Sequence, residues 1–292
     1  MQIHLIDGTF ELFRHHYALP SHINRDGQEV AATRGVLASL LTLLEAGATH
    51  VGVATDHVIE SFRNDLYPGY KTGDGIETAL RSQFELLEET LAAAGFALWP
   101  MSTFEADDAL ATAAARAAAD PRVEQVLLCT PDKDLAQCVV ARRIVQLDRR
   151  RGVTLDAAGV VEKFGVEPAS IPDYLALVGD SADGFPGLPG WGAKSAAAVL
   201  ARYRHLEAIP ERADAWRVKL RGAAKLAETL ARERERALLF RRIATLVCDG
   251  PEVGAVDDWR WRGPRGALEE LCDYLEAPRM HERATRAAQR RA

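Results

Sequence analysis

The first half of the chain alternates short apolar runs with longer segments whose apolar residues recur at helical spacing. The apolar runs predict strands at 3–6, 51–54, 96–99, 126–129 and 144–147. The helical spacing predicts helices at 31–46, 78–94 and 105–119. Alternation of this kind is typical of an α/β fold with a mainly parallel central sheet flanked by helices. In such sheets, ligands bind at the carboxyl ends of the strands.

The pattern changes after about residue 155, where strand signals stop and short helical segments follow. A Gly/Pro-rich stretch, FPGLPGWG at 185–192, interrupts these segments, and an arginine-rich helical region follows at 216–242. We therefore predict an α/β domain over 1–160 and a helical domain over 161–292. The arginine-rich region has two interpretations: a solvated helix face, which is the commoner case, or a surface that contacts DNA.

Composition limits the setting in which the chain works. Its opening, MQIHLID, is unlike a signal peptide, and no stretch approaches the roughly 18 apolar residues of a membrane span. The four cysteines form no C-x-x-C pair, so we expect free thiols in a reducing cytoplasm and no structural zinc site. The net charge of −6 does not exclude DNA binding, because the distribution of charge decides it. The tail at 283–292 has few large apolar residues and is expected to fray.

Acidic residues gather where predicted strands end and where helices begin. They are Asp7 and Asp56, each after a strand, Asp132 and Asp134 after a further strand, Glu105, Asp107 and Asp108 at a helix start, and Asp180 and Asp183 in GDSAD. Taken singly, an Asp after a strand is most often a turn residue or a helix cap. The acids at 105–108 could equally complement a helix dipole.

Taken together, these carboxylates predict a metal site. In a parallel sheet most of them would converge at one edge, and like charges 4 Å apart repel by roughly 4 kcal/mol at an effective dielectric near 20. Hard divalent cations are the natural compensation, and Mg²⁺ or Mn²⁺ suits a site of carboxylates and water. A pair of such ions fits in-line displacement at phosphorus, so the residues themselves indicate metal-dependent phosphate chemistry.

A glycine-rich turn opens a helix in the second half, in GLPGWGAKSA at 187–196. Gly187, Gly190 and Gly192 allow close backbone approach, and Lys194 adds a cation near the helix start. Such a turn is more often a tight connection between helices, and its spacing is not that of a phosphate-binding Walker loop. Between two helices it also suits a helix-hairpin-helix that grips a DNA backbone without reading sequence.

A third group lies in SFRNDLYPGYK at 61–71, where basic and aromatic residues alternate. Arg63 and Lys71 could bind phosphate, and Tyr67 and Tyr70 could stack on a base. A solvated surface loop with incidental tyrosines explains the same pattern equally well.

An ordered series of motifs resembles the 5′-nuclease family, in particular the 5′-3′ exonuclease domain at the front of bacterial DNA polymerase I and its stand-alone relatives. The motifs are LIDGTFELFR (5–14), FEADD (104–108), TPDKDLAQ (130–137), VVEKFGVEPASIPDYLALVGD (160–180), GDSADGFPGLPGWGAKSA (179–196) and LFRRIATL (239–246). The resemblance covers nearly the whole chain and implies a PIN-like catalytic core with a C-terminal helix-hairpin-helix domain. No polymerase sequence follows, so we expect a stand-alone member.

The resemblance also implies roles for individual residues. One metal site would use Asp7, Asp56, Glu105, Asp107 and Asp108, and a second would use Asp132, Asp134, Asp180 and Asp183, some of them through water. Both would hold Mg²⁺, for which Mn²⁺ can substitute. Arg63 and Lys71 would lie on a helical arch near 60–85 and act on the scissile phosphate.

The resemblance further implies contacts with DNA. The expected residues are Arg14, Arg63, Tyr70, Lys71, Gly187, Gly190, Gly192, Lys194 and Ser195. The helix-hairpin-helix would lie near 183–203 and bind K⁺ against duplex DNA. The implied activity is 5′-3′ exonuclease and 5′-flap endonuclease cleavage by two metal ions, in replication or repair. We expect a monomer near the nucleoid that works beside a DNA polymerase and a ligase.

Two positions depart from the family pattern. Gly184 stands where asparagine is usual, and Asp74 stands three residues after Lys71, where relatives often carry arginine. The acid at 74 bears on how a 5′ end would be handled at the arch.

Three other functions deserve comparison. D-G-T at 7–9 resembles haloacid-dehalogenase-type phosphatases, but Leu5 occupies the position of their nucleophile, so the covalent step has no start. A non-catalytic DNA-binding protein on the same scaffold is the alternative from another class, and the complete acid set argues against it. A metal-dependent ribonuclease is the nearest enzymatic alternative, although the helix-hairpin-helix favours DNA.

Overall fold

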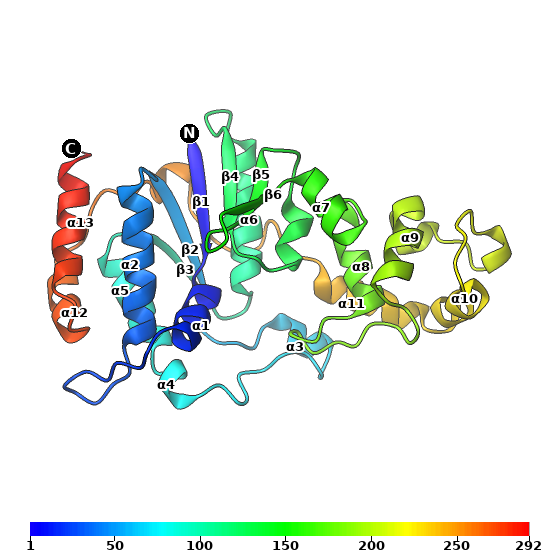
Figure 1. Cartoon of the computed structure of the whole chain (residues 1–292), viewed down its shortest axis with the longest axis horizontal. Helices are drawn as coiled ribbons and strands as arrows, with labels where there is room; N and C mark the ends of the chain where they lie inside the picture. Colours follow the sequence, from blue (N-terminus) through cyan, green and yellow to red (C-terminus); the bar gives the residue numbers. More distant parts are fainter. Residues whose placement is uncertain (292) are drawn as a thin grey trace. The chain divides into compact units, whose positions relative to one another are not determined.

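The computed structural model describes residues 1–291, which form two compact units (Figure 1). The sheet unit comprises Met1–Ile59, Gly73–Thr130 and Cys248–Ala292, and the helical unit comprises Glu60–Thr72 and Pro131–Val247. Both units are discontinuous in sequence, whereas the predicted domains were continuous; the division at residue 160 stays a prediction.

The sheet unit is built on four parallel strands in the order β3-β2-β1-β4. They are β1 (Gln2–Asp7), β2 (His50–Asp56), β3 (Ala97–Met101) and β4 (Gln125–Cys129). Each confirms a predicted strand to within two residues. The central strands are apolar on both faces because helices cover both sides of the sheet.

Five helices of the sheet unit belong to its first two segments. They are α1 (Gly8–Ala18), α2 (Ala31–Glu45), α4 (Thr78–Arg81), α5 (Phe84–Ala93) and α6 (Ala106–Ala119). The predicted helix at 78–94 is thus broken into two. At the break the side chain of Gln83 is buried and accepts a hydrogen bond from the backbone N–H of Thr33 at 3.0 Å.

The last segment of the sheet unit returns to pack on it, as η5 (Val256–Trp259), α12 (Leu268–Tyr274) and α13 (Arg279–Gln289). The expectation of a frayed tail is wrong for the described residues. Helix α13 lies beside α2 (Figure 1), with Ala284 buried and with Arg283 paired to Glu45 at 2.8 Å. Small alanines permit close helix packing, so large apolar residues are not needed there.

The helical unit contains short helices around its own core. Its elements are α3 (Phe62–Leu66), η1 (Asp134–Cys138), β5 (Ile144–Asp148), β6 (Val153–Leu155), α7 (Ala157–Phe164), η2 (Pro168–Ser170), α8 (Ile171–Val178), α9 (Ala193–Tyr203), η3 (Leu206–Ala208), η4 (Ala213–Ala215), α10 (Ala223–Arg232) and α11 (Arg234–Ala244). Phe185 and Phe240 meet in the core with ring centroids 5.4 Å apart. Helix α8 packs on α11 and α9. No helix within residues 1–291 is long and apolar enough to cross a membrane.

Candidate metal and nucleic-acid site

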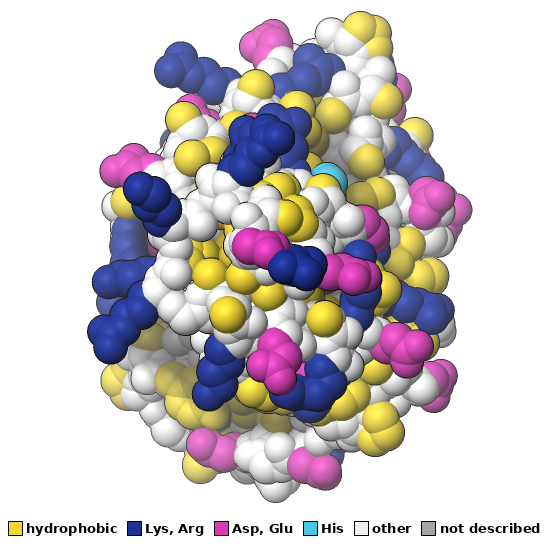
Figure 2. All heavy atoms as spheres, turned by 90° about the vertical axis from the view of Figure 1, so that its right-hand side faces the viewer, with side chains coloured by type: hydrophobic (Ala, Val, Ile, Leu, Met, Phe, Trp, Pro, Cys, Tyr) yellow, Lys and Arg dark blue, Asp and Glu magenta, His cyan; other side chains and the backbone are white. Residues whose placement is uncertain are grey.

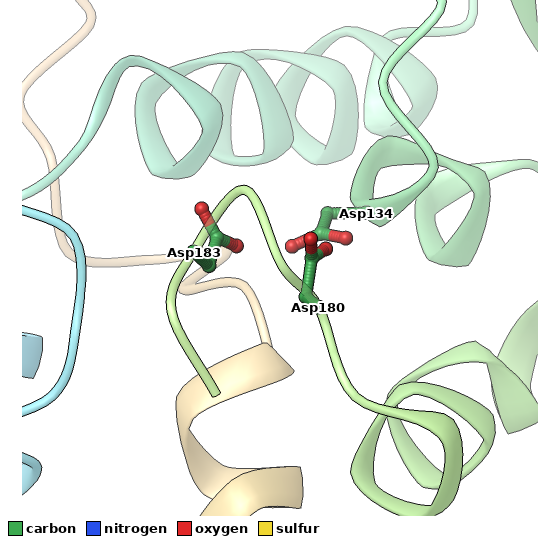
Figure 3. A group of neighbouring side chains, drawn as sticks. All are labelled: Asp134, Asp180 and Asp183. Atoms are coloured by element: carbon green, nitrogen blue, oxygen red, sulfur yellow. The ribbon is translucent and has the colours of Figure 1, made fainter. Parts of the chain in front are cut away.

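Three predicted acids of the helical unit converge. Carboxylate oxygens of Asp134, Asp180 and Asp183 lie within 4.8 Å of one another, close enough for one metal ion (Figure 3). Asp134 comes from η1, whereas Asp180 and Asp183 come from the loop after α8 (Figure 3). The cluster therefore joins two segments that are about 45 residues apart in sequence.

The electrostatics of this cluster are unfavourable without a cation. Burial, followed by the charges of Asp132, Asp183 and Asp180, holds the pKa of Asp134 well above its usual range. One carboxylate oxygen of Asp134, Oδ1, is buried and has no hydrogen-bond partner among residues 1–291. An orphaned buried carboxylate oxygen beside two further acids is the arrangement that a hard divalent cation stabilises.

Lys133 supplies part of the compensating charge, and the sequence analysis did not single it out. Its ammonium group lies 2.6 Å from Asp180. Its pKa is raised: burial opposes the charged form, but the hydrogen bond and charge of Asp180 outweigh it. The D-K-D motif could have indicated this role, because it places the lysine between Asp132 and Asp134. Lys133 alone does not neutralise this group of acids.

Local backbone contacts fix these carboxylates. Asp132 is exposed, and its side chain accepts the backbone N–H of Asp134 at 2.9 Å. The loop from Asp180 closes through a bridge to Phe185, with N···O distances of 2.8 and 3.0 Å. Gly187 allows this closure, because its φ is +68° and a Cβ there would lie 2.4 Å from the backbone nitrogen of Gly179.

Glycine at 184 has a steric explanation. Its φ is +84°, a conformation that asparagine also tolerates, but a Cβ would come within 2.3 Å of the carbonyl oxygen of Gly69. The close approach of the 69–71 backbone to this loop therefore favours glycine. Asp74, the second departure, is exposed in a turn.

The sheet unit carries the other five acids. Asp7 ends β1 and Asp56 ends β2, at the carboxyl edge of the parallel sheet. Asp7 caps α1 by accepting the backbone N–H of Phe10 at 2.8 Å, and its other oxygen accepts the Thr130 hydroxyl at 3.1 Å. The helix-cap interpretation is therefore correct for Asp7, and it does not exclude a metal-binding role, since a carboxylate oxygen can accept more than one partner.

Asp56 lies against the start of α6. One of its oxygens accepts the backbone N–H of Ala106 at 2.8 Å. Glu105 and Asp108 are buried there, Asp107 is partly exposed, and the side chain of Asp108 accepts the backbone N–H of Glu105 at 3.1 Å. Four predicted acids thus share one helix N-terminus, whose partial positive charge favours carboxylates.

Lys71 lies at the acidic cluster. Its ammonium group is 3.2 Å from Asp183, and its backbone N–H donates to the carbonyl of Asp183 at 3.0 Å. The side chain is about a quarter exposed, at 26%. A cation at this place offsets part of the negative charge of the acidic cluster.

Arg63 and Tyr70 do not fit their predicted roles. Arg63 is 1% exposed, and its guanidinium donates to the carbonyls of Ile243 at 2.8 Å and Thr245 at 3.3 Å. Tyr70 is 3% exposed and belongs to the core of the helical unit. Both are structural in this conformation, because buried groups cannot meet a phosphate or a base. The expected arch at 60–85 contains the short helices α3 and α4 joined by turns.

The glycine-rich turn opens α9 as predicted. Gly192 caps the helix, its backbone N–H donating to the hydroxyl of Ser195 at 3.0 Å. Gly190, Gly192, Lys194 and Ser195 line a cavity of about 580 Å³, which also includes Arg221 and Lys225 from the start of α10. Lys194 is exposed, and Lys and Arg side chains are numerous on the face that carries α9 and α10 (Figure 2). The sequence analysis did not single out Arg221 or Lys225.

Arg14 lies on α1 in the sheet unit, where it pairs with Glu11 and is about a quarter exposed, at 24%. Its guanidinium also contacts the ring of His15. The carboxylate of Glu11 offsets the charge of the Arg14 guanidinium.

Fold and site define a PIN-like α/β unit, with acids at the carboxyl edge of a parallel sheet, joined to a helical unit. Two family models match the chain: "5′-3′ exonuclease, N-terminal resolvase-like domain" at 2–165 and "5′-3′ exonuclease, C-terminal SAM fold" at 166–267. The chain belongs to the 5′-3′ exonuclease family.

Curated relatives agree with this assignment. The chain is 34% identical over 281 residues to DNA polymerase I of Mycobacterium leprae, covering 93% of this chain and 30% of the relative. It is 36% identical over 255 residues to DNA polymerase I of Pseudomonas aeruginosa, covering 84% of this chain and 27% of the relative. The chain therefore spans less than a third of the length of these relatives.

Solved structures share the fold. T5 5′-exonuclease with bound zinc aligns with a TM-score of 0.67 at 18% identity, covering 94% of this chain and 100% of that chain. Flap endonuclease-1 of Methanococcus jannaschii aligns with a TM-score of 0.63 at 16% identity, covering 100% of this chain and 93% of that chain.

Proposed function

We propose that this protein is a divalent-metal-dependent nuclease that hydrolyses DNA from a 5′ end or at a 5′ flap. The observation that carries the proposal is the group Asp134, Asp180 and Asp183, whose charges converge around an orphaned oxygen. Family membership supports the reaction class, and the structurally similar T5 5′-exonuclease, which has been solved with bound divalent zinc ions, supports the type of cofactor.

The proposed ligands fall into two groups. Asp132, Asp134, Asp180 and Asp183 would hold one ion, and Asp7, Asp56, Glu105, Asp107 and Asp108 would hold the other, some through water. Oxygen donors without His or Cys fit Mg²⁺ or Mn²⁺ best. When bound, such ions supply a water of lowered pKa and offset the charge that develops on the phosphate.

The protein's own residues position the substrate and balance charge. Lys71 lies beside Asp183, so it can exchange that partner for a non-bridging phosphate oxygen and donate to it as negative charge grows. Lys133 holds Asp180 in place by its 2.6 Å contact. The cavity at the start of α9 would receive the duplex backbone through Lys194 and exposed backbone N–H groups, with K⁺ as a further bound ion.

Cleavage of a labelled 5′-flap duplex tests the proposal. The assay compares Mg²⁺, Mn²⁺ and EDTA for the wild type, for Asp134→Asn and for Asp273→Asn, a matched change at an exposed acid of α12. We expect cutting near the flap junction with both metals and none in EDTA. Asp134→Asn should lose at least about 10²-fold in rate, and Asp273→Asn should cut normally.

The scaffold alternative predicts a different result. A wild-type protein that binds the flap with either metal but never cuts it would overturn the nuclease proposal and favour a structure-specific DNA-binding protein. Association with a DNA polymerase and a ligase at the nucleoid, and a monomeric state, are parts of the proposal that co-purification and sedimentation would test separately.

A further inference from the structure

A cluster of arginines surrounds two adjoining cavities at the start of β2, at the opposite end of the strand from Asp56. The cavities have volumes of about 530 and 410 Å³, and both are lined by Thr49 and Arg291. The arginine cluster consists of Arg260, Arg262, Arg283, Arg286, Arg290 and Arg291. All six belong to the last segment of the sheet unit, which packs beside α2 (Figure 1).

Two of these arginines are engaged in holding the fold. Arg283 makes a bidentate pair with Glu45 at 2.8 and 2.9 Å. Arg291 donates to the carbonyls of Leu44 at 2.5 Å and Ala48 at 2.7 Å, at the end of α2, and lies over the ring of Trp261. These contacts attach α13 and the residues after it to the end of α2. They occupy some of the hydrogen-bond donors of the two guanidinium groups.

The other four arginines have no carboxylate partner within residues 1–291. They are Arg260, Arg262, Arg286 and Arg290, and all four are exposed. Glu45 is the one acid that lines either cavity in the described part of the chain, and Arg283 already pairs with it. In a chain with a net charge of −6, this is a strong local excess of positive charge.

The positive charge of the arginine cluster affects the ionisation of Glu45. The pKa of Glu45 is lowered, first by the hydrogen bond from Arg283 and then, beyond the opposing effect of burial, by the charges of Arg283, Arg290 and Arg286. Exposed like charges that converge on a cavity repel unless an anion lies between them. Guanidinium groups fit phosphate best, since their planar donors bind two oxygens at once.

We propose that the arginine cluster binds the phosphate backbone of a DNA segment that flanks the cleavage site. Identifying the ligand as DNA rests on the proposed function, whereas the preference for phosphate rests on the cluster alone. His50 begins β2 beside the cluster, and Asp56 ends it at the acidic edge. At about 3.3 Å per residue, the two ends of the strand are roughly 20 Å apart. A DNA segment that reaches both must therefore span at least about six base pairs at 3.4 Å each.

The test is DNA binding as a function of salt, in EDTA so that nothing is cut. Fluorescence anisotropy would compare the wild type with Arg286→Ala, Arg290→Ala and the double variant on a long flap duplex. Arg279→Ala is the matched control, since Arg279 is an exposed arginine of the same helix that lines neither cavity. Each cluster variant should reduce the slope of log K against log salt by about 0.9, and the double variant by about twice that. Arg279→Ala should leave the slope unchanged.

Length dependence and competition sharpen the test. On substrates with fewer than about six base pairs beside the cleavage site, wild type and double variant should bind alike. Equal slopes for all five proteins on the long duplex would overturn the inference. So would a melting temperature that rises with inorganic phosphate in the wild type alone while the DNA slopes stay equal, because the cluster would then be a site for free phosphate.

Failure of the inference differs from failure of the proposed function. If the nuclease proposal holds and the inference fails, the wild type cuts the flap and the slopes do not differ. If the nuclease proposal fails, the wild type does not cut with Mg²⁺ or Mn²⁺, whatever the slopes are. If the variants lose thermal stability without a change in slope, the inference fails. Arg286 and Arg290 would then serve to offset the partial negative charge at the C-terminus of α13.

Discussion

The ammonium group of Lys71 lies 3.2 Å from the carboxylate of Asp183, while Arg63, eight residues earlier, points into the core. Two basic residues of one short segment thus have opposite environments. Lys71 can contact a substrate, whereas Arg63 stabilises the fold. Replacing each residue should therefore have a different effect.

Replacing Lys71 should slow the chemical step. Lys71→Ala should lower the single-turnover rate on a 5′-flap duplex by about 10² to 10³, because one positioned donor to the phosphate is lost. Lys71→Arg should recover part of the rate, and affinity for DNA should change little. Lys163→Ala, which removes a lysine that lies over Phe164, is the control. An unchanged rate for Lys71→Ala would remove this residue from the site.

Replacing Arg63 should unfold the protein more easily. Arg63→Ala removes the donor to the buried carbonyl of Ile243 and the donor to the partly buried carbonyl of Thr245, which should cost about 2–5 kcal/mol of unfolding free energy. Urea midpoints would measure the loss. Arg236→Ala, at a half-exposed arginine over Phe240, should cost less than about 1 kcal/mol. If Arg63→Ala kept its midpoint but lost cleavage, the predicted role at the phosphate would be correct after all.

The carboxylate of Asp134 should destabilise the folded protein in the absence of metal. Because its buried oxygen is unpaired and its neighbours are acids, Asp134→Asn should stabilise the protein in EDTA by about 1–3 kcal/mol. The same variant should lose any rise in melting temperature that Mg²⁺ gives the wild type. Differential scanning calorimetry with and without metal measures both effects. A variant that melts lower than wild type in EDTA would contradict this account.

Two glycines of the same turn should respond differently to alanine. Gly187→Ala should cost about 2–4 kcal/mol, because its φ is +68° and a Cβ would overlap the backbone of Gly179. Gly192→Ala should cost less than about 1 kcal/mol, because nothing lies within 4 Å of its Cβ position. Thermal unfolding of the two variants compares them directly, and similar losses would argue against the hairpin geometry.

Stability in acid should depend on Glu207. The hydrogen bond from Arg241 lowers the pKa of Glu207 from 4.5 to about 2, so its contribution is full above pH 4.5 and is lost as the pH falls through 2. Glu207 is half exposed, so Glu207→Gln should cost no more than about 1 kcal/mol at pH 6. Urea midpoints of the two proteins should converge near pH 2. A difference that grows as the pH falls would have the wrong sign for this ion pair.

Sequence patterns predicted the strands of the sheet unit because buried parallel strands are continuous apolar runs. They also placed Asp7 and Asp56 correctly, since the residue after a parallel strand must lie at the carboxyl edge. The convergence of Asp134 with Asp180 depended on how loops fold, and only the motifs of the family pointed to it.

The sequence did not predict which way the side chains of the segment 61–71 point. The acceptors for Arg63 lie 180 and 182 residues later in the chain, and no local pattern shows that its guanidinium turns inward to reach them. Tyr70 was misread for the same reason. The tail at 283–292 was misread because its contacts are alanine packing and arginine pairs, which apolar periodicity does not register.

The discontinuous sheet unit has a consequence for biosynthesis. Trp261 donates its ring N–H to the carbonyl of Ala94 at 2.8 Å, and its backbone N–H donates to Thr49 at 2.9 Å. These partners leave the ribosome long before residue 261 does. At about 5–20 residues per second, the earlier strands wait roughly ten seconds or more for the segment that completes their core. During that interval the nascent chain exposes apolar surface, which makes it a natural client for chaperones at the ribosomal exit.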